Sequence, residues 1–152
     1  MSTDHDADIA ALRAWFAAWD KLVDAVDFAA ARNLFHDDVV GFGTHMDTLR
    51  GLDALERLQW RSVWPTIDGF RFALDTLQAI VSPDRLQATA VLTWTSTGYH
   101  EDGRPFDRQG RATAVFTRQH GGEKWRAIHT HMSLYPGTPQ RSHGKKPERT
   151  SA

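Results

Sequence analysis

The first third of the chain carries apolar residues at helical spacing. Between Ile9 and Val26 they recur at intervals of three and four, at Ile9, Leu12, Trp15, Phe16, Trp19, Leu22, Val23 and Val26. This spacing places them on one face of an amphipathic helix. We also expect a short helix over 28–34, a brief strand over 39–43, and a third helix from Gly51 to Trp64, where Pro65 ends it.

The second half of the chain changes to an alternating pattern. From Leu86 to Tyr99, polar residues, mostly threonines, alternate with Ala88, Ala90, Leu92 and Trp94. Strict alternation predicts a strand with one buried face. Turn-forming residues at 101–105 and 120–123 separate this segment from 106–118 and 125–134. The pattern therefore predicts antiparallel hairpins that follow the helices, which is the order of an α+β fold.

The length of 152 residues corresponds to one domain. We expect a short lead-in over 1–7, a folded domain over 8–135 and a tail over 136–152. The tail has no apolar periodicity and holds four basic residues and one acidic residue. This composition predicts a disordered basic tail, and it favours that interpretation over a nucleic-acid-binding arm.

Composition excludes several classes of function. Eighteen basic and nineteen acidic residues leave no broad basic field for nucleic acid. No apolar run approaches the roughly 18 residues that a membrane span needs. The absence of cysteine excludes disulfides, thiolate catalysis and cysteine–zinc sites. The acidic start does not match a secretory signal, so we expect a cytoplasmic protein without nucleic-acid or membrane partners.

Four local strings resemble a known family. They are the segments 34–39 (LFHDDV), 50–55 (RGLDAL), 110–116 (GRATAVF) and 125–133 (WRAIHTHMS). Together they resemble the SnoaL-like branch of the nuclear transport factor 2-like superfamily, close to the association domain of calcium/calmodulin-dependent kinase II. The resemblance implies a cystatin-like fold, in which a curved antiparallel sheet forms a cone around the first helix. It also implies a conical pocket and a homodimer formed through the outer face of the sheet.

The resemblance also indicates which residues line the pocket. They are Trp15, Trp19, Gly43, Leu58, Gln59, Trp94, Ala112, Ala114, Ile128, Thr130 and Met132. Such a lining is mostly apolar and suits a small hydrophobic or aromatic molecule, although for Trp19 a place in the core is the favoured interpretation. The related ketosteroid isomerases use a carboxylate base at the position that corresponds to Gly43. We therefore assign none of the catalytic residues of those enzymes to positions in this chain.

Two further groups of residues have competing interpretations. His129 and His131 are two apart on a strand, so both rings point to one face, as two metal ligands would. The family geometry places them on the outer face, where a hydrogen bond or a subunit contact is the favoured explanation; a metal site remains the alternative. Arg111 is expected on the outer face too, and anion binding is its alternative role. Trp60 and Trp64 are expected to be partly exposed.

Two functions remain open at this point. One is a cofactor-free lyase, isomerase, cyclase or hydratase that acts on an apolar substrate. The other is a non-catalytic module that binds a ligand or forms oligomers. No catalytic residue is assigned and no cofactor is expected, so the sequence leaves enzymatic activity undecided.

Overall fold

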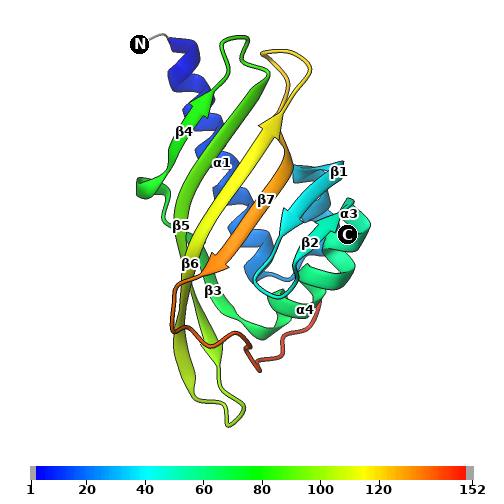
Figure 1. Ribbon diagram of the computed structural model, residues 1–152, viewed down its shortest axis with the longest axis vertical. Coiled ribbons are helices and arrows are strands. Elements are labelled where there is room, and N and C mark those ends of the chain that lie inside the picture. Colours follow the sequence, from blue (N-terminus) through cyan, green and yellow to red (C-terminus); the bar gives the residue numbers. More distant parts are fainter. Residues whose placement is uncertain (1–2, 150–152) are drawn as a thin grey trace.

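A curved sheet lies against one long helix in the computed structural model, which describes residues 3–149 (Figure 1). The seven strands are β1 (Phe35–Phe42), β2 (Thr48–Arg50), β3 (Asp68–Phe72), β4 (Gln78–Val81), β5 (Gln87–Tyr99), β6 (Pro105–Thr117) and β7 (Arg126–Leu134). Their order in the sheet is β2-β1-β7-β6-β5-β3. The remaining strand, β4, lies outside this order and also pairs with β5. The predicted α+β class is confirmed.

The helical elements precede or connect the strands. They are α1 (Thr3–Asp24), α2 (Phe28–Ala31), η1 (Arg32–Leu34), α3 (Leu52–Ala54), η2 (Leu55–Trp60), α4 (Arg61–Val63), η3 (Trp64–Thr66) and η4 (Leu74–Thr76). The element α1 begins at Thr3, inside the stretch expected as a lead-in. The expected third helix is present as one helical run, but its middle, η2, is a π-helix. Within residues 3–149, no helix is long and apolar enough to cross a membrane.

One strand pair differs from the expected antiparallel sheet. The pairs β5–β6 and β6–β7 are antiparallel, as short connections require, but β1 and β7 are parallel. A parallel pair needs a long connection, and here most of the chain lies between the two strands. The sheet is therefore mixed.

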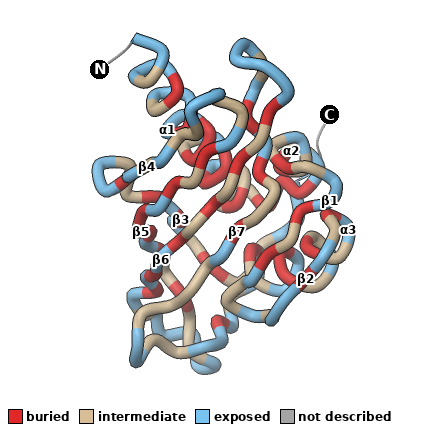
Figure 2. The backbone as a smooth tube through the Cα atoms, turned by 45° about the horizontal axis from the view of Figure 1, so that its top comes forward, coloured by how far each residue is buried: buried red, intermediate tan, exposed pale blue. Residues whose placement is uncertain are grey.

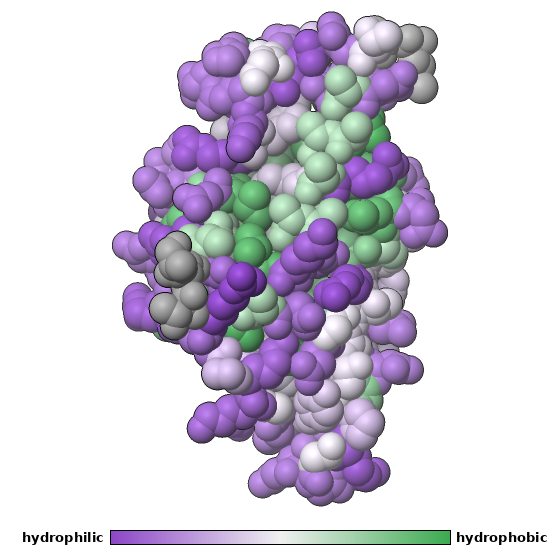
Figure 3. Space-filling view, turned by 180° about the vertical axis from the view of Figure 1, so that it is seen from behind, coloured by the Kyte–Doolittle hydropathy of each residue, from purple (hydrophilic) through white to green (hydrophobic). Residues whose placement is uncertain are grey.

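The inner face of the sheet and α1 enclose an aromatic core. Along β5, buried and more exposed residues alternate as predicted, as the burial colours of the strand show (Figure 2). The ring of Trp15 packs edge-on against Phe16, Phe35 and Phe116, with centroid distances of 5.0, 5.4 and 4.7 Å. Seen from the side opposite to Figure 1, apolar residues gather across the middle of the molecule, and both ends are polar (Figure 3).

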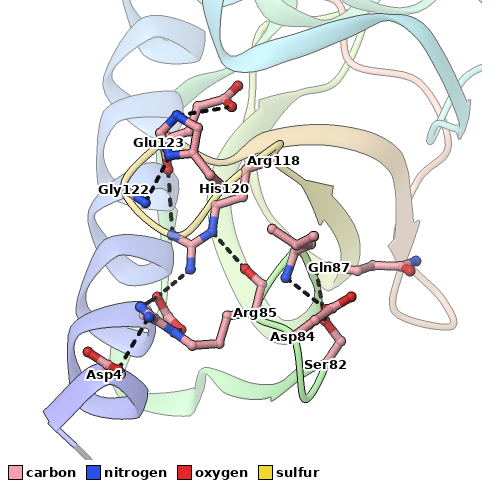
Figure 4. A network of polar contacts seen from close by, with 11 residues as sticks. Asp4, Ser82, Asp84, Arg85, Gln87, Arg118, His120, Gly122 and Glu123 are labelled. Carbon is pink, nitrogen blue, oxygen red and sulfur yellow. Dashed lines mark hydrogen bonds and ion pairs between the residues drawn. The ribbon is translucent and has the colours of Figure 1, made fainter.

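A buried ion-pair network fixes the first part of α1. Asp8 is 2% exposed and accepts hydrogen bonds from Nε and Nη2 of Arg85 at 2.7 and 2.9 Å, and from Nη2 of Arg118 at 2.8 Å. Arg118 also donates to the Arg85 carbonyl (Figure 4). Its guanidinium lies 3.8 Å over the ring of Trp125. The network therefore ties α1 to the β4–β5 turn and to the end of β6.

The segment 136–149, expected to be disordered, packs along the helical run and the β5–β6 hairpin. The Lys146 amide donates to the Pro65 carbonyl at 2.7 Å, and its ammonium group donates to the Asp24 carbonyl at 2.7 Å. Ser142 donates to the Thr66 carbonyl. Composition does not indicate which distant segments meet, so it predicts none of these hydrogen bonds. The last three residues of the predicted tail lie outside the described residues.

Candidate functional site

A cavity of ≈ 40 Å³ lies between the inner face of the sheet and the helical run, near the C-terminal end of α1. This is room for roughly three water molecules. It is lined by Trp19, Val23, Phe42, Gly43, Thr44, Leu55, Gln59, Trp60, Val63, Trp64, Ile67, Phe70, Trp94, Arg108, Thr130 and Met132. Aromatic rings dominate this lining, and its polar side chains are few.

The π-helix η2 supplies one wall of the cavity. It turns Leu55, Gln59 and Trp60 inward, and all three are buried. A π-helix is wider than an α-helix, is rare, and occurs frequently at functional sites. The ring of Trp60 stacks on that of Trp64 at 4.6 Å, and both residues are at least 95% buried. The expectation that these two tryptophans are partly exposed was therefore wrong, because it assumed regular α-helical spacing.

Gln59 holds the loop that follows β1. Its Oε1 accepts hydrogen bonds from the amides of His45 and Met46 at 3.1 and 2.9 Å, and its Nε2 donates to Thr44 Oγ1 at 3.3 Å. Gly43 makes this possible, since a Cβ at that position would collide with the Gln59 side chain. An amide therefore fills the space next to the position at which the ketosteroid isomerases carry their base.

Arg108, on β6, is the one cationic side chain of the cavity lining within residues 3–149. It is 3% exposed; its Nη2 donates to Thr44 Oγ1 at 2.9 Å, and its guanidinium lies 5.3 Å over the ring of Trp94. Burial lowers the pKa of Arg108 to about 10, so the group is still charged at neutral pH. Gly110, two residues on, leaves room for the Trp94 ring against β6.

A wider hollow of ≈ 460 Å³ adjoins the cavity. Arg108 and Val63 line both, so the guanidinium stands between the inner space and the outer one. The other residues around the hollow are His45, Ser62, Thr66, Gln140, Arg141, Ser142, His143 and Gly144. The C-terminal segment thus forms one side of the hollow.

Comparison with known proteins identifies the family. The model of the SnoaL-like domain matches residues 12–137. The chain belongs to the SnoaL-like domain family. Among curated proteins, no sequence matches the chain significantly.

Solved structures that resemble this SnoaL-like domain share its fold at low identity. A nuclear transport factor 2-like superfamily protein from Salmonella enterica superposes with a TM-score of 0.72 and 18% identity, covering 89% of this chain and 96% of that one. A ketosteroid isomerase-like protein from Erwinia carotovora gives 0.71 and 17%, covering 87% and 98%. A Xanthomonas campestris protein, named as a candidate calcium/calmodulin-dependent protein kinase II association domain, gives 0.68 and 20%, covering 84% and 87%.

The structure of the SnoaL-like domain brings together part of the predicted pocket set. Six of these residues line the cavity: Trp19, Gly43, Gln59, Trp94, Thr130 and Met132. Five do not: Trp15, Leu58, Ala112, Ala114 and Ile128. The cavity therefore occupies only the part of the cone next to the C-terminal end of α1.

Packing explains these five positions. The rings of Phe35 and Phe116 fill the cone around Trp15, whose Nε1 donates to the Leu34 carbonyl at 3.0 Å. Ala112 and Ala114 are buried in the core, and Leu58 packs against it from η2. Ile128 lies at a β-bulge, where the β6–β7 register shifts between Val115 and Phe116. A bulge inserts one residue and reverses the inward and outward alternation beyond it.

The remaining predicted residues lie on the outer face of the sheet. His129 Nδ1 shares a hydrogen bond with the Val40 carbonyl at 2.8 Å, and the exposed His131 ring lies 4.9 Å from that of Phe42. Arg111 is exposed, with its guanidinium 5.7 Å over the Tyr135 ring. In the described part of the chain, no group of three or more metal-binding side chains is present to complete a site with the histidines.

Arg108 is a polar residue of the cavity lining that the predicted pocket set does not include. The sequence does indicate that Arg108 faces inward, because it has the same strand parity as Ala112 and Ala114, which we expected to face inward. The lining contains no aspartate, glutamate or histidine among the described residues. The site can therefore hold an apolar body and donate hydrogen bonds, but it offers no carboxylate or imidazole for proton transfer.

Proposed function

We propose that this SnoaL-like domain binds a small aromatic or otherwise hydrophobic molecule in the cavity and the adjoining hollow. The observation that carries the proposal is the lining itself. The indoles of Trp19, Trp60, Trp64 and Trp94 and the ring of Phe70 face one enclosed space beside few polar groups. Aromatic walls with a small number of polar groups are the usual composition of a small-molecule site.

The volumes restrict how such a ligand binds. Ligand sites usually have about 300–1,000 Å³, whereas the inner cavity has ≈ 40 Å³. A ligand must therefore displace side chains or extend into the hollow of ≈ 460 Å³. Met132 is the most adaptable residue of the wall, since it is partly exposed and its unbranched side chain repacks easily.

Binding without catalysis fits the lining better than an enzymatic function. Lyases, isomerases, cyclases and hydratases that use no cofactor move protons with a positioned acid or base. The described lining of the inner cavity holds no carboxylate or imidazole, and the imidazoles of His45 and His143 lie in the outer hollow. One of the similar structures is named as ketosteroid isomerase-like, and that activity would need a base that Gly43 does not supply here.

Titration with aromatic compounds tests the proposal, because tryptophans of the wall report binding through their fluorescence. We expect neutral and acidic naphthalene derivatives to quench the emission of the wild type. Thr130→Leu, which fills the cavity from β7, should weaken binding at least tenfold. Thr113→Leu, the same change on the outer face of β6, is the control and should leave binding unchanged. Equal binding by wild type and Thr130→Leu would contradict the proposed site.

Self-association through the outer face of the sheet is a second candidate function. A row of paired residues crosses four strands there, from Val91 through Thr113 and His131 to Phe42. Val91 and Phe42 are 43% and 38% exposed, which is high for large apolar side chains. The similar protein from Xanthomonas campestris is named as an association domain, which supports a second copy of this chain as the occupant of this face.

A further inference from the structure

We propose that the ligand of this site is a monocarboxylate with an aromatic or apolar body, and that Arg108 binds its carboxylate. The inference rests on the proposed function and adds the chemical class of the ligand. In this arrangement the guanidinium holds the carboxylate at the junction of cavity and hollow. The hydrophobic part of the molecule then lies against the indoles of the inner cavity.

Arg108 is buried without an acidic partner among the described residues. Of its five N–H donors, Nη2 bonds to the neutral Thr44 hydroxyl, and neither Nε nor Nη1 has a hydrogen bond to a described residue. None of the ion pairs of residues 3–149 includes Arg108. Buried charges in proteins are normally paired, because leaving water is costly for an ion. An incoming anion would supply the missing partner.

The same chain provides a contrast. Arg118 lies 4% exposed at the other end of β6, and it also lies over an indole ring. Unlike Arg108, it pairs with the buried Asp8 at 2.8 Å. The fold thus gives one buried arginine its carboxylate and leaves the other, which faces the cavity, without one.

Two tryptophans of the wall have indole N–H groups without a hydrogen-bond partner among the described residues. The Nε1 atoms of Trp19 and Trp94 are buried and have no hydrogen-bond partner in the described structure. Both indoles line the cavity. An indole N–H only donates, as does a guanidinium. The wall therefore contains two unpaired donors, but neither nitrogen has accessible surface in the cavity, so a ligand that accepts hydrogen bonds reaches them only if the wall repacks.

The ionisable side chains around the entrance are basic. The described lining of the hollow contains Arg108 and Arg141 together with His45 and His143, and it holds no aspartate or glutamate. A negative ligand is therefore attracted toward Arg108 from outside. One buried cation matches one negative charge. A guanidinium also holds a carboxylate through two parallel hydrogen bonds, which makes a monocarboxylate the fitting head group.

A purely structural role accounts poorly for Arg108. Neither its packing on Trp94 nor its single hydrogen bond to Thr44 requires a charged side chain at this position. Replacing buried ionic groups by apolar residues of similar volume often stabilises a protein. We therefore expect Arg108→Met to raise the melting temperature of the ligand-free protein while it removes carboxylate binding.

The test compares a matched pair of probes, 1-naphthoate and the neutral 1-naphthamide, by titration calorimetry at pH 7. For the wild type we expect 1-naphthoate to bind at least tenfold more tightly. Arg108→Met should bind the two probes equally. Arg111→Met, which removes an exposed arginine from the outer face of the same strand, should retain the preference.

Each outcome separates this inference from the proposed function. Equal binding of both probes by the wild type overturns the carboxylate assignment and leaves the aromatic pocket in place. Binding of neither probe overturns the pocket and the assignment together. If Arg108→Met still prefers 1-naphthoate to 1-naphthamide, whether or not its melting temperature falls, Arg108 is structural. This result overturns its proposed role in carboxylate binding.

Discussion

At the scale of single residues, one hydroxyl group links the two polar side chains of the site. Thr44 Oγ1 accepts from Gln59 Nε2 at 3.3 Å and from Arg108 Nη2 at 2.9 Å. Gln59 in turn holds the amides of His45 and Met46. The loop after β1 and the buried guanidinium are therefore positioned by one small network, and a change in Gln59 affects the loop first.

Gln59→Leu should release this loop. The substitution leaves the amides of His45 and Met46 without their acceptor. Because His45 is exposed and Met46 only partly buried, the two lost hydrogen bonds together cost about 1–3 kcal/mol. We expect a loss of free energy of unfolding in that range and faster hydrogen exchange at both amides. Gln59→Glu keeps an acceptor oxygen and is the control. Unchanged exchange in Gln59→Leu would show that the loop is held by other contacts.

The sequence predicted some residue positions of the site and missed others. The alternation along β5 places Trp94 inward, because strand parity is a local property. The same parity rule applies to Arg108, yet no sequence pattern shows that a buried arginine has no acidic partner. The pairing of a charge depends on which distant elements approach it.

At the scale of elements, α1 is fixed at two heights by buried carboxylates. Asp8 pairs with Arg85 and Arg118. Three turns later, Asp20 accepts a hydrogen bond from the Phe72 amide at 3.0 Å, and burial raises the pKa of Asp20. These contacts hold α1 against the sheet and so fix the position of the wall that Trp19 provides.

Asp8→Asn should destabilise the protein at neutral pH. Breaking a buried ion pair from one side costs about 3–5 kcal/mol. The hydrogen bonds from Arg85, and then those from Arg118, hold the pKa of Asp8 below its ordinary value of 3.8. A carboxylate with a lowered folded-state pKa stabilises the fold above its unfolded pKa, and this contribution is lost as the pH falls toward the folded value.

Urea unfolding at several pH values checks this prediction. The difference between wild type and Asp8→Asn should be largest near pH 7 and should shrink as the pH falls below about 5. Asp4→Asn is the matched control, since Asp4 is exposed and forms only an outer ion pair with Arg85 at 3.4 Å; it should change stability by less than about 1 kcal/mol. A difference that does not vary with pH would show that the charge of Asp8 is not what stabilises α1.

At the scale of the whole molecule, the two faces of the sheet serve different purposes. The inner face packs on α1 and provides the cavity. The outer face carries the row from Val91 to Phe42, with no helix over it in Figure 1. The proposed ligand site and the proposed self-association surface share only Phe42, at the end of β1, so a change at Val91 alters the outer face while ligand binding is measured.

Val91→Lys should disrupt self-association by placing a charge at the β5 end of this row on the outer face. Sedimentation velocity is expected to show a dimer for the wild type and a monomer for the variant, with naphthoate binding retained. Glu101→Lys, in the exposed β5–β6 turn, introduces the same residue away from this row and should leave the dimer intact. A monomeric wild type would contradict the second candidate function.

The sequence alone determined the features that depend on local periodicity. The amphipathic α1, the alternating faces of β5 and β6, and the outward position of Arg111 follow from spacings of 3.6 and 2 residues. The same pattern predicted the order of the elements, with helices before the hairpins, and the family resemblance implied the cone. These features need no knowledge of which segments meet in space.

Tertiary structure decided what depends on contacts between distant segments. The parallel β1–β7 pair, the bulge at Ile128 and the packing of residues 136–149 all involve partners that are far apart in the sequence. The position of the cavity follows from the same contacts, because aromatic rings fill the cone around Trp15 and leave it open beside Trp19. The unpaired charge of Arg108 belongs here too, since burial and the absence of an anion are properties of the assembled fold.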